Sequence, residues 1–444
     1  MKGKLLAPGG TRDYARVSTD TRTLKAGDVF VALKGPRYDG TKFFDKALKA
    51  GAAALVGTSG FPGSERKAAL VKVGDPLRAL QDLALDQRLL FEHPVVAITG
   101  SNGKTSTKEC LAWLLGGRDL VLSTPGNWNN HVGLPLTLLG LERHHRFAVL
   151  ELGMNHFGEL SRLARICRPD VSMVLNVGDA HLEYFGTRRN VAKAKEELLQ
   201  GTGSQGCAVI NGDDPLVAGM GERFKGRVLS FGSGRRCELR LLALRDSGAA
   251  GLRAKISWMD KTHAFALKQG GRVRLAQAMA SLAACLALGK EMGPLLQRLE
   301  AFEPAAKNRQ QLKKIGGATY ILDMYNASPQ SMAAGLELLE ASAPTGRRVA
   351  LLGDMLELGL AAPRFHYMAG REARARGVSA LAALGPNAKE TLRGFGGTGK
   401  AFATTEVALA AQWLKEQVKA GDWVLLKGSR GMALERVLDP KVGG

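Results

Sequence analysis

Apolar strand segments alternate with helical segments through the middle of the chain, and this alternation restricts the possible fold more than any other feature. The strand segments are VVAI (95–98), FAVLEL (147–152), VSMVLNV (171–177) and CAVINGD (207–213). Strands that are joined through helices pack as right-handed crossovers in a parallel sheet. We therefore predict a central parallel sheet.

Two further α/β units flank this sheet in the sequence. The first eighty residues hold the strand segment VFVALKG (29–35) and a helical face in residues 43–50, followed by a glycine and a second apolar run. After the polar stretch 305–314 a new alternation begins. Its strand segments are TYILDMY (319–325), RRVALLGDM (347–355), SALAALG (379–385) and DWVLLKGSR (422–430). This second alternation predicts another parallel sheet.

Residues 228–267 differ from the rest of the central region. Their short alternating segments RVLSFGS, GLRAKISW and HAFAL are separated by glycine turns. We expect an antiparallel patch attached to the central sheet. At about 150 residues per domain, 444 residues predict about three domains. We expect a small α/β domain at 1–80, a central domain at 81–307 and a C-terminal domain at 308–444.

The composition excludes several classes of protein. A hydrophobic fraction of 45% is ordinary for a globular protein. The chain start lacks the roughly 7–15 apolar residues of a signal peptide, and no window approaches the roughly 18 apolar residues of a membrane span. The five cysteines are far apart and form no C-x-x-C pair, which argues against a disulfide framework and a thiolate zinc site. We expect a soluble, cytoplasmic protein with reduced, mostly buried cysteines.

The formal net charge of +21 indicates an anionic partner, and nucleic acid is the first class to consider. However, the basic residues occur as scattered pairs, such as Arg188-Arg189 and Arg235-Arg236, without long runs or interleaved aromatic residues. A basic solvated surface, or an enzyme with several phosphorylated ligands, fits this distribution better.

The stretch VVAITGSNGKTSTKE (95–109) has the order of a phosphate-binding loop, in which a strand turns through glycines into a helix. The usual G-x-x-x-x-G-K-[ST] register would need glycine where Ile98 stands, so the ring here is the shorter G-x-x-G-K-T. Its two glycines let backbone N–H groups approach phosphate oxygens, and Lys104 adds a positive charge at a helix N-terminus. The hydroxyl of Thr105 is the group expected on Mg²⁺.

A metal-bound triphosphate also needs acidic oxygen ligands. Glu151 ends the strand segment FAVLEL, and His181 follows the next one, VSMVLNV. Because parallel strands end at the same edge of a sheet, these two side chains are expected near the loop.

Eight sequence strings with family character occur in order across nearly the whole chain. They are TGSNGKTSTKE, NWNNHVGLPLTLL, ELGMNHFGEL, NVGDAHLEYFG followed by AKAKEEL, NGDDP, DMYNASPQSM, GDMLELG and KGSRGM. Together they resemble the Mur ligase family. The first domain also resembles the uridine-nucleotide domain of these enzymes, in the segment STDTRTLKAGDVFVALKGPRYDG (18–40).

The resemblance implies an ATP-dependent amide ligase of peptidoglycan precursor synthesis. It implies that ATP phosphorylates the terminal carboxylate of UDP-N-acetylmuramoyl-tripeptide, and that the amine of D-alanyl-D-alanine attacks the acyl phosphate. The implied fold has a uridine-nucleotide domain, a central phosphate-loop ATPase domain and a C-terminal Rossmann-like domain. ATP and two Mg²⁺ ions are the implied cofactors. The implied partners are small molecules, with no nucleic acid, and a monomer is expected.

The family's functional residues carry over onto matching positions. The implied ATP-binding residues are Gly100, Ser101, Asn102, Gly103, Lys104, Thr105 and Ser106, with Arg309 on the terminal phosphate and Asp323 on the ribose. The implied metal ligands are Thr105, Glu151, His181 and Lys195. The implied substrate-binding residues are Asp20, Thr21, Arg22, Asn129, Asn130, Asn326, Lys427, Ser429 and Arg430. Lys104, Lys195, Glu151, His181 and Arg309 are the implied catalytic set.

Two lysines, Lys193 and Lys195, lie two positions apart in one helical segment. At about 100° per residue they point to nearly opposite faces, so only one can face the site. The register resembles the family position of a carbamylated lysine, which favours Lys195. A carbamate there would hold the second Mg²⁺; a bare surface lysine is the alternative.

The chain departs from the family at three places. Arg274 and Gln277 stand where asparagines face adenine, which puts recognition of the base in doubt. Only Asp323 remains of a paired acid, and Asn308 replaces the glycine before Arg309.

Two alternative functions stay open. Another ligase of the same superfamily, such as a folate-polyglutamating enzyme or the Mur ligase that adds the third amino acid, would share the loop and the metal ligands. A phosphate-loop ATPase stimulated by nucleic acid is the alternative from a different class. The identity of the third residue of the tripeptide is open as well.

Overall fold

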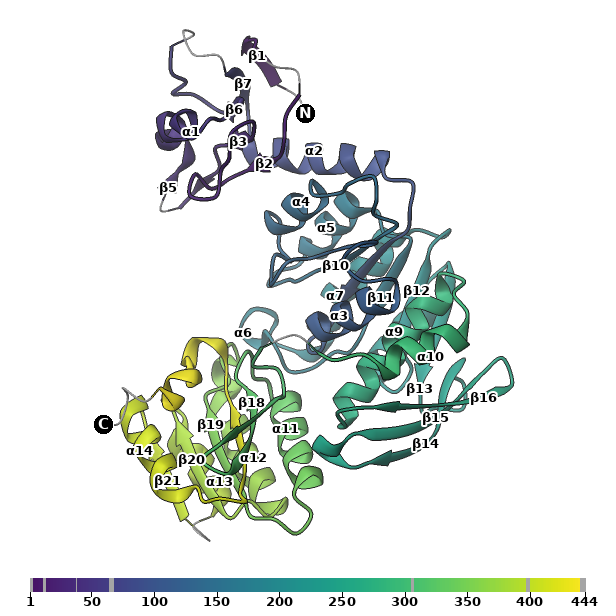
Figure 1. The fold of residues 1–444 in the computed structure, drawn as a ribbon, viewed down its shortest axis with the longest axis vertical. Helices are drawn as coiled ribbons and strands as arrows, with labels where there is room; N and C mark the ends of the chain where they lie inside the picture. The colour runs from purple at the N-terminus through teal and green to yellow at the C-terminus, as the bar shows by residue number, and fades with distance from the viewer. Residues whose placement is uncertain are drawn as a thin grey trace.

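The structure is a computed structural model that describes residues 3–10, 13–36, 38–63, 68–304, 307–396 and 400–439. Its described residues form three large sheets, one after another along the chain, each packed against helices, and one two-stranded hairpin (Figure 1). The predicted three-part α/β fold is therefore confirmed, whereas the limits 1–80, 81–307 and 308–444 stay predictions. Arg37 of the uridine-type segment and Ala305 and Ala306 of the polar stretch lie outside the described residues.

The N-terminal sheet has five strands in the order β1-β7-β6-β3-β2. The strands are β1 (Gly3–Ala7), β2 (Val17–Ser18), β3 (Val29–Val31), β6 (Ala54–Gly57) and β7 (Ala69–Val73), and all pairs except β1–β7 are parallel. A small hairpin of β4 (Lys34–Gly35) and β5 (Tyr38–Asp39) precedes a short helix, α1 (Phe44–Lys49). Phe44 and Ala47 of that helix are buried against the sheet.

Helix α2 (Pro76–Leu90) connects the N-terminal sheet to the central one. Asp75 caps its start by accepting hydrogen bonds from the N–H groups of Leu77 and Arg78. Leu80 packs in one apolar cluster with Val31 and Val73 of the first sheet and with side chains of the region around α4. The helix therefore belongs to the packing of both parts.

The central sheet has nine strands in the order β16-β15-β14-β13-β12-β11-β8-β10-β9. Its strands are β8 (Val95–Thr99), β9 (Val121–Ser123), β10 (Phe147–Glu151), β11 (Val171–Val174), β12 (Cys207–Asn211), β13 (Arg227–Gly232), β14 (Leu239–Asp246), β15 (Leu252–Trp258) and β16 (Lys261–Leu267). The strands from β9 to β14 run parallel. Strand β8 thus lies between β10 and β11, and the ends of all three meet at one edge.

The antiparallel patch is smaller than the sequence pattern suggests. Strand β13, which holds RVLSFG, pairs in parallel with both β12 and β14, and only β14, β15 and β16 form antiparallel pairs. The prediction was therefore wrong for residues 227–232. The alternation of exposed and buried residues along this strand resembles an antiparallel edge strand. However, helix α8 (Pro215–Arg223) connects β12 to β13, and such a crossover joins parallel strands.

Helices cover both faces of the central sheet. They are α3 (Lys104–Leu114), α4 (Gly133–Leu138), α5 (Glu159–Cys167), α6 (Leu182–Phe185), α7 (Arg188–Thr202), α8 (Pro215–Arg223), α9 (Arg272–Ala287) and α10 (Met292–Glu300). Two apolar clusters fill the space, one under α3 and α9 and the other under α5 and α7. Four of the five cysteines are buried and all five are free, as expected.

The C-terminal sheet has the order β17-β18-β22-β19-β20-β21. Its strands are β17 (Gln311–Ile315), β18 (Ala318–Asp323), β19 (Arg348–Gly353), β20 (Ala380–Leu384), β21 (Lys400–Thr404) and β22 (Trp423–Lys427). The helices are α11 (Pro329–Ser342), α12 (Ala362–Ala375), α13 (Ala388–Phe395) and α14 (Val407–Gln417). All pairs except β17–β18 are parallel. The sequence analysis missed the two edge strands, β17 and β21.

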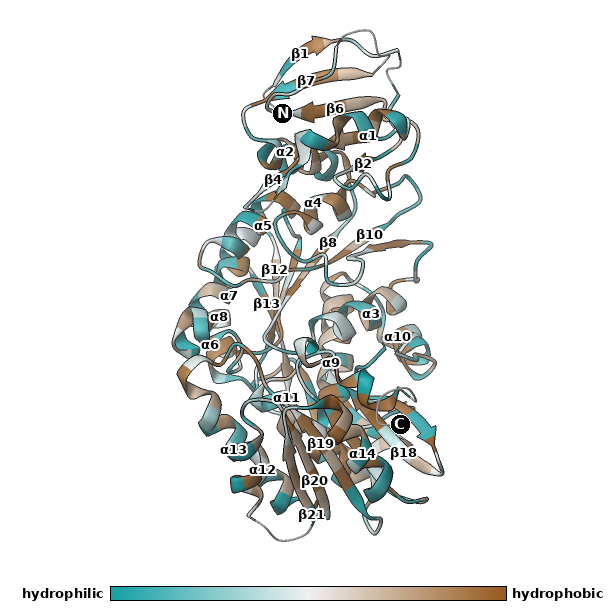
Figure 2. Cartoon of the chain, turned by 90° about the vertical axis from the view of Figure 1, so that its left-hand side faces the viewer, coloured by the Kyte–Doolittle hydropathy of each residue, from teal (hydrophilic) through white to brown (hydrophobic). Residues whose placement is uncertain are grey.

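Apolar residues lie in the strands and on the inner faces of the helices. Figure 2 shows β19, β20 and β21 largely in brown, whereas the helices around them carry teal on one side. Among the described residues, no helix combines the length and apolar character that a membrane crossing needs.

Candidate active site between the central and C-terminal sheets

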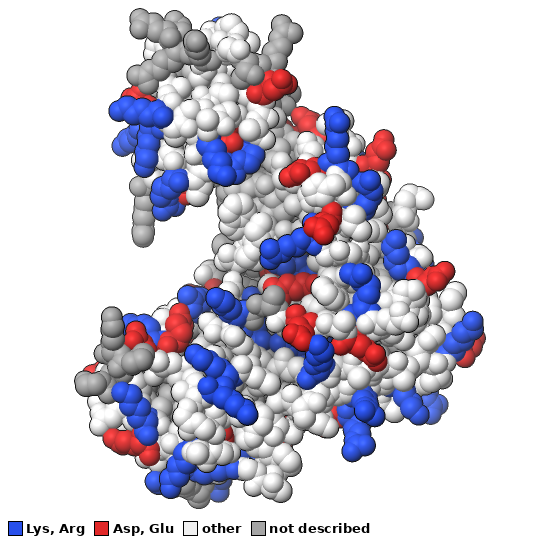
Figure 3. All heavy atoms as spheres, viewed as in Figure 1, with Lys and Arg blue, Asp and Glu red and all other residues white. Residues whose placement is uncertain are grey.

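A cavity of about 1050 Å³ lies where the central sheet faces the C-terminal sheet. Figure 3 shows a deep notch on the same side of the molecule, between its N-terminal and C-terminal parts. The predicted site residues that line the cavity are Ser101, Asn102, Gly103, Lys104, Thr105, Ser106, Asn129, Asn130, Glu151, His181, Lys195, Arg309, Asp323, Asn326 and Lys427. Residues more than 300 positions apart in sequence therefore meet in one space.

The phosphate loop connects β8 to α3, as the sequence predicts. Gly103 takes a φ of +87° at the start of the helix, a conformation that glycine adopts without strain. The ammonium Nζ of Lys104 donates a hydrogen bond to the carbonyl of Gly100, 2.7 Å away. Burial lowers the pKa of Lys104, and the charge of Glu151 opposes that shift. The loop thus places one partly buried cation at a helix N-terminus.

Asn176, just beyond β11, holds the loop in place. Its Oδ1 accepts from the N–H of Asn102 at 2.9 Å, and its Nδ2 donates to the Asn102 carbonyl at 3.0 Å. The carbonyl of Asn176 also accepts from the N–H of Ser101. Three hydrogen bonds therefore fix the loop to the neighbouring strand, and the sequence analysis had given Asn176 no role.

Thr105 and Glu151 form an oxygen pair at the start of α3. The hydroxyl of Thr105 donates to Oε2 of Glu151 at 2.7 Å, and Nδ2 of Asn129 donates to Oε1 of the same carboxylate at 2.9 Å. Glu151 is 3% exposed. Hydroxyl and carboxylate oxygens are the ligands that Mg²⁺ prefers, and it usually keeps waters and substrate phosphates in its remaining positions. This pair fits a magnesium site, although the described residues include no cluster of three or more His, Cys, Asp or Glu side chains suited to a metal.

Lys108, one turn further along α3, orients this pair. Its buried Nζ donates to the carbonyl of Thr124 at 2.6 Å, and the Thr124 hydroxyl accepts from the N–H of Glu151 at 2.9 Å. Burial lowers the pKa of Lys108. The sequence analysis gave this lysine no role, although its position four residues after Lys104, on the same helix face, was a usable signal.

His181 lies on the far side of the cavity and faces the C-terminal domain. Its Nδ1 is 2.7 Å from Oε2 of Glu357, which precedes the short helix η3 (Gly359–Ala361). The contact with His181 lowers the pKa of Glu357. Within the described residues no contact joins His181 to Thr105 or Glu151. The predicted metal role of His181 stays a prediction.

Lys195 and Lys193 have opposite surroundings on α7. Lys195 is 1% exposed and lines the cavity, whereas Lys193 is exposed. Within the described residues Lys195 has no carboxylate partner. Burial lowers its pKa well below the usual value, and the charge of Lys104 adds to the effect. The expectation that only one of the two faces the site, and that it is Lys195, agrees with this arrangement.

Arg309 reaches the phosphate loop from the segment between the two sheets. Its Nη2 donates to Oγ1 of Thr105 at 3.0 Å, and its guanidinium lies 3.8 Å from the ring centroid of Tyr325. Asn308 has a φ of +58°. Asparagine tolerates this left-handed conformation better than most residues, which explains how the chain manages without the family's glycine.

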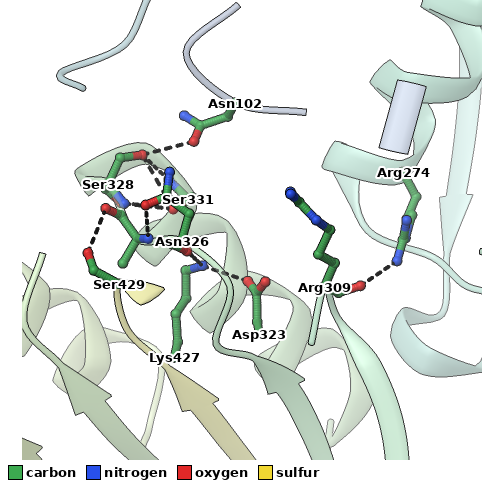
Figure 4. Close-up of polar contacts among 10 residues, drawn as sticks. Asn102, Arg274, Arg309, Asp323, Asn326, Ser328, Ser331, Lys427 and Ser429 are labelled. Atoms are coloured by element: carbon green, nitrogen blue, oxygen red, sulfur yellow. Dashed lines mark hydrogen bonds and ion pairs between the residues drawn. The ribbon is translucent and has the colours of Figure 1, made fainter. Parts of the chain in front are cut away.

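The C-terminal domain adds a buried ion pair to the cavity. Nζ of Lys427 lies 2.6 Å from Oδ2 of Asp323 and 3.2 Å from the carbonyl of Asn326 (Figure 4). Lys427 is 1% exposed. Ser429 is also buried, and its hydroxyl accepts from the N–H of Leu356 at 3.0 Å. The lone acid that replaces the family's pair is thus matched by one lysine.

Several predicted substrate residues lie away from the cavity lining. Arg430 forms an ion pair with Glu435 near the chain's end. Asp20, Thr21 and Arg22 lie in the N-terminal domain, where Asp20 accepts hydrogen bonds from Arg22 and its pKa falls to about 2. The structure therefore leaves this turn apart from the phosphate loop.

Two residues at the start of α11 contact the central domain at the cavity rim. The hydroxyl of Ser328, at the start of α11, donates to Oδ1 of Asn102 at 3.1 Å (Figure 4). Oε1 of Gln330 accepts from the N–H of Asp179 at 3.0 Å. Both C-terminal residues belong to the string DMYNASPQSM, but no sequence rule identifies which residues they contact.

The fold and the site agree with comparisons to known proteins. The chain matches models described as Mur ligase family, catalytic domain (residues 13–88), Mur ligase middle domain (98–285) and Mur ligase, glutamate ligase domain (308–430). It is 33% identical over 453 residues to the UDP-N-acetylmuramoyl-tripeptide--D-alanyl-D-alanine ligase of Bacillus subtilis (strain 168), covering 99% of this chain and 95% of that relative.

Solved structures give the same result. MurF from Acinetobacter baumannii superposes with a TM-score of 0.87 at 31% identity, covering 95% of this chain and 92% of that one. MurF ligase from Thermotoga maritima, solved in complex with ADP, superposes with a TM-score of 0.85 at 31% identity, covering 95% and 96%. The chain therefore belongs to the Mur ligase family.

Proposed function

We propose that this Mur ligase joins D-alanyl-D-alanine to UDP-N-acetylmuramoyl-tripeptide and converts ATP to ADP and phosphate. The observation that carries the proposal is the meeting, in one cavity, of the phosphate loop, the Thr105–Glu151 oxygen pair and the Arg309 guanidinium. Relatives of this name at 33% identity over nearly the whole chain favour it over a ligase that adds a different amino acid.

The proposed reaction has two steps. A terminal carboxylate oxygen of the tripeptide attacks the γ-phosphorus of ATP, and ADP leaves. The amine of D-alanyl-D-alanine then attacks the acyl carbon, loses a proton and forms the amide, while phosphate leaves. A carboxylate is a poor acyl donor, so phosphorylation is needed to create a leaving group. The protein contributes positioning and charge stabilisation.

The chain's residues divide this work. Lys104 and the loop N–H groups hold the ATP phosphates, and Arg309 neutralises the charge that develops during phosphoryl transfer. Thr105 and Glu151 would hold a Mg²⁺ ion, which when bound screens the phosphate charge. The hydrogen bond from the Arg309 guanidinium to the Thr105 hydroxyl supports this division, since it brings the two groups to the same end of the loop.

A second metal ligand is proposed at Lys195. A neutral amine is the form that adds to carbon dioxide, and the lowered pKa of Lys195 favours that form. The resulting carbamate would replace a buried, unpaired cation with an oxygen ligand, and together with His181 it would hold a second Mg²⁺. The absence of a carboxylate partner among the described residues supports a modification that changes the sign of its charge.

The remaining assignments concern the substrates. Asp323 is proposed to bind the ATP ribose. Asp20, Thr21 and Arg22 are proposed to bind the uridine nucleotide, and Asn129 and Asn130 to line the path of the peptide. Asn326, Lys427, Ser429 and Arg430 are proposed near the dipeptide or the acyl phosphate. A cytoplasmic location and a monomeric state belong to the same proposal.

The test is an omission experiment. Phosphate release and amide formation are measured with purified protein, ATP and Mg²⁺, leaving out each of the two other substrates in turn, and with DNA or RNA added instead. We expect sustained turnover only when both the UDP-linked tripeptide and D-alanyl-D-alanine are present, with one phosphate per amide bond. Stimulation by nucleic acid alone would instead favour a nucleic-acid-dependent ATPase. Lys and Arg side chains that are spread among Asp and Glu across the face in Figure 3 weigh against that outcome.

A further inference from the structure

Arg274 is a buried guanidinium that the proposed chemistry leaves without a role. It lies in the first turn of α9, is 6% exposed and lines the main cavity. Within the described residues no carboxylate lies within ion-pair distance of it, and its Nε has no hydrogen-bond partner. Burial lowers the pKa of Arg274, and the charges of Asp323 and Glu109 offset this shift only in part. Because a buried cation without a directly paired anion destabilises a fold, the position calls for a function that offsets this cost.

The partners of Arg274 point to the interdomain segment. Its Nη2 donates to the backbone carbonyl of Arg309 at 2.8 Å, and its Nη1 donates to Oε1 of Gln277 at 3.3 Å. Figure 4 shows the Arg274 side chain directed from α9 toward the Arg309 backbone, across the boundary between the domains. Arg274 and Gln277, which replace the family's adenine-facing asparagines, thus contact each other. Arg274 also contacts the segment that carries Arg309.

That segment has an unusual backbone. Asn308 and Gln310 both adopt left-handed conformations, with φ of +58° and +56°, on either side of Arg309. Non-glycine residues hold such conformations only where their surroundings impose them. Three hydrogen bonds hold this backbone. The carbonyl of Asn308 accepts from the Tyr325 N–H at 3.2 Å. The next two carbonyls, of Arg309 and Gln310, accept from Arg274 at 2.8 Å and from Nε2 of Gln269 at 2.5 Å.

The middle of these three contacts controls the residue that reaches the loop. Arg309 packs its guanidinium over Tyr325 and donates to Thr105. The Arg309 carbonyl is thus held by Arg274, and the Arg309 guanidinium is held at the phosphate loop. Loss of the Arg274 hydrogen bond would free the Arg309 backbone to turn, and the guanidinium could then leave the loop.

We propose that Arg274 is a positioning residue, which anchors the Arg309 carbonyl to α9 and so holds the Arg309 guanidinium at the phosphate loop. The inference rests on the proposed ATP-dependent ligation. It assigns to Arg274 no contact with the reacting atoms. A direct contact with the nucleotide base is the competing role, and the experiment distinguishes the two.

The experiment is a double-mutant cycle on Arg274→Ala and Arg309→Ala, with kcat and the KM for ATP measured for amide formation. We expect Arg274→Ala to lower kcat by about 10-fold and to change the KM for ATP by less than about 2-fold. In the Arg309→Ala background the same substitution should lower kcat by less than about 2-fold, because it acts through Arg309. Arg274→Lys, whose ammonium can still donate to a carbonyl, should recover part of the loss.

Control variants and alternative outcomes complete the test. Arg272→Ala removes a guanidinium two positions earlier on α9, one that pairs with Glu337 across the same domain boundary, and should change kcat by less than about 2-fold.

An equal loss in both backgrounds, an unchanged kcat, or a raised KM for ATP alone with altered preference among purine nucleotides would overturn the proposal. If Arg274→Ala does not fold, the cycle is run with Arg274→Lys, with an expected loss of about 3-fold. Wild-type protein that forms no amide would overturn the proposed function instead.

Discussion

The phosphate loop and the interdomain segment meet at Thr105, but they are held in different ways. The loop runs directly from β8 into α3, and the backbone of Ser101 and Asn102 is held by Asn176 on the adjacent strand end. Ser328 and Arg309, in contrast, contact only loop side chains. The segment 308–310 depends on donors from α9, from the loop before it and from the C-terminal domain. One element is held within a single sheet, whereas the other exists only where two domains pack together.

This difference has a consequence for function. We expect a loop whose backbone is held within one sheet to keep its geometry if the C-terminal domain moves, and the Arg309 segment, which depends on contacts from both domains, to lose its geometry. Enzymes with sites between domains often complete the catalytic arrangement on closure. Substitutions in the loop should therefore abolish chemistry in every domain arrangement, while substitutions at the rim should act by changing how often the closed arrangement forms.

The largest effect is expected at Lys104. Lys104→Ala removes the positive charge at the loop, so the rate of amide formation should fall about 100-fold or more, with the KM for the UDP-linked peptide little changed. Steady-state kinetics measure the rate and the KM, and a thermal melt checks that the variant is folded. Unchanged kinetics in a folded protein would break the comparison, because the loop would then not carry the phosphate chemistry.

Lys195 is expected to rank second, with Lys193 as its matched control on the same helix. Lys195→Ala should lower the rate about 10-fold or more, and short carboxylic acids should restore part of it by supplying the missing oxygen ligand. Lys193→Ala should stay within about 2-fold because that side chain is exposed. Mass spectrometry of the intact protein checks for a carbamate. Loss of activity without rescue by acids, together with an unmodified mass, would leave Lys195 without a metal role.

A third, separate part of the molecule sharpens the comparison. Arg22→Ala breaks the exposed pair with Asp20 in the N-terminal domain. We expect the KM for the UDP-linked peptide to rise about 10-fold while kcat at saturation stays within about 2-fold, since only ground-state binding is lost. Isothermal titration with UDP alone provides an independent measurement. A fall in kcat would show that this turn is coupled to the phosphate loop.

The smallest effect is expected at the rim. Gln330→Ala removes the acceptor for the Asp179 N–H and the donor to the Asp179 carboxylate, two hydrogen bonds that join α11 to the central domain. We expect kcat/KM to fall by about 2- to 5-fold, with a larger radius of gyration in small-angle scattering, because the closed arrangement loses both hydrogen bonds. Gln412→Ala, which removes a hydrogen bond to Glu416 on the exposed face of α14, serves as the control. An effect as large as that at Lys104 would erase the distinction between the two regions.

The sequence was most informative where the chemistry is local. The strand, glycine turn and helix around Lys104 were all predicted in place, and the periodicity of α7 separated Lys195 from Lys193. It was least informative where contacts are distant, as at Arg309, Glu357 and Asn176. The parallel pairing of β13 was also missed, because exposure along a strand at the edge of an apolar core alternates whichever way its neighbours run.

The departures from the family pattern show the same limit. Asn308 in place of glycine, and Arg274 in place of asparagine, look like two unrelated losses in the sequence. In the structure both act on the segment that carries Arg309, Asn308 through its left-handed backbone and Arg274 through a hydrogen bond from α9. The role of Arg274 does not follow from its residue type, since it depends on a partner 35 positions away.

The order of residues alone determined the alternation of strands and helices, the phosphate loop and the opposite directions of Lys193 and Lys195 on α7, since all three follow from backbone geometry over a few residues. Only the packing of the central and C-terminal sheets against each other decided that Arg309 reaches Thr105, that Ser328 contacts Asn102 and that His181 meets Glu357. Such contacts depend on the relative position of whole domains, which buried apolar surface and interdomain hydrogen bonds set together and which no short stretch of chain encodes.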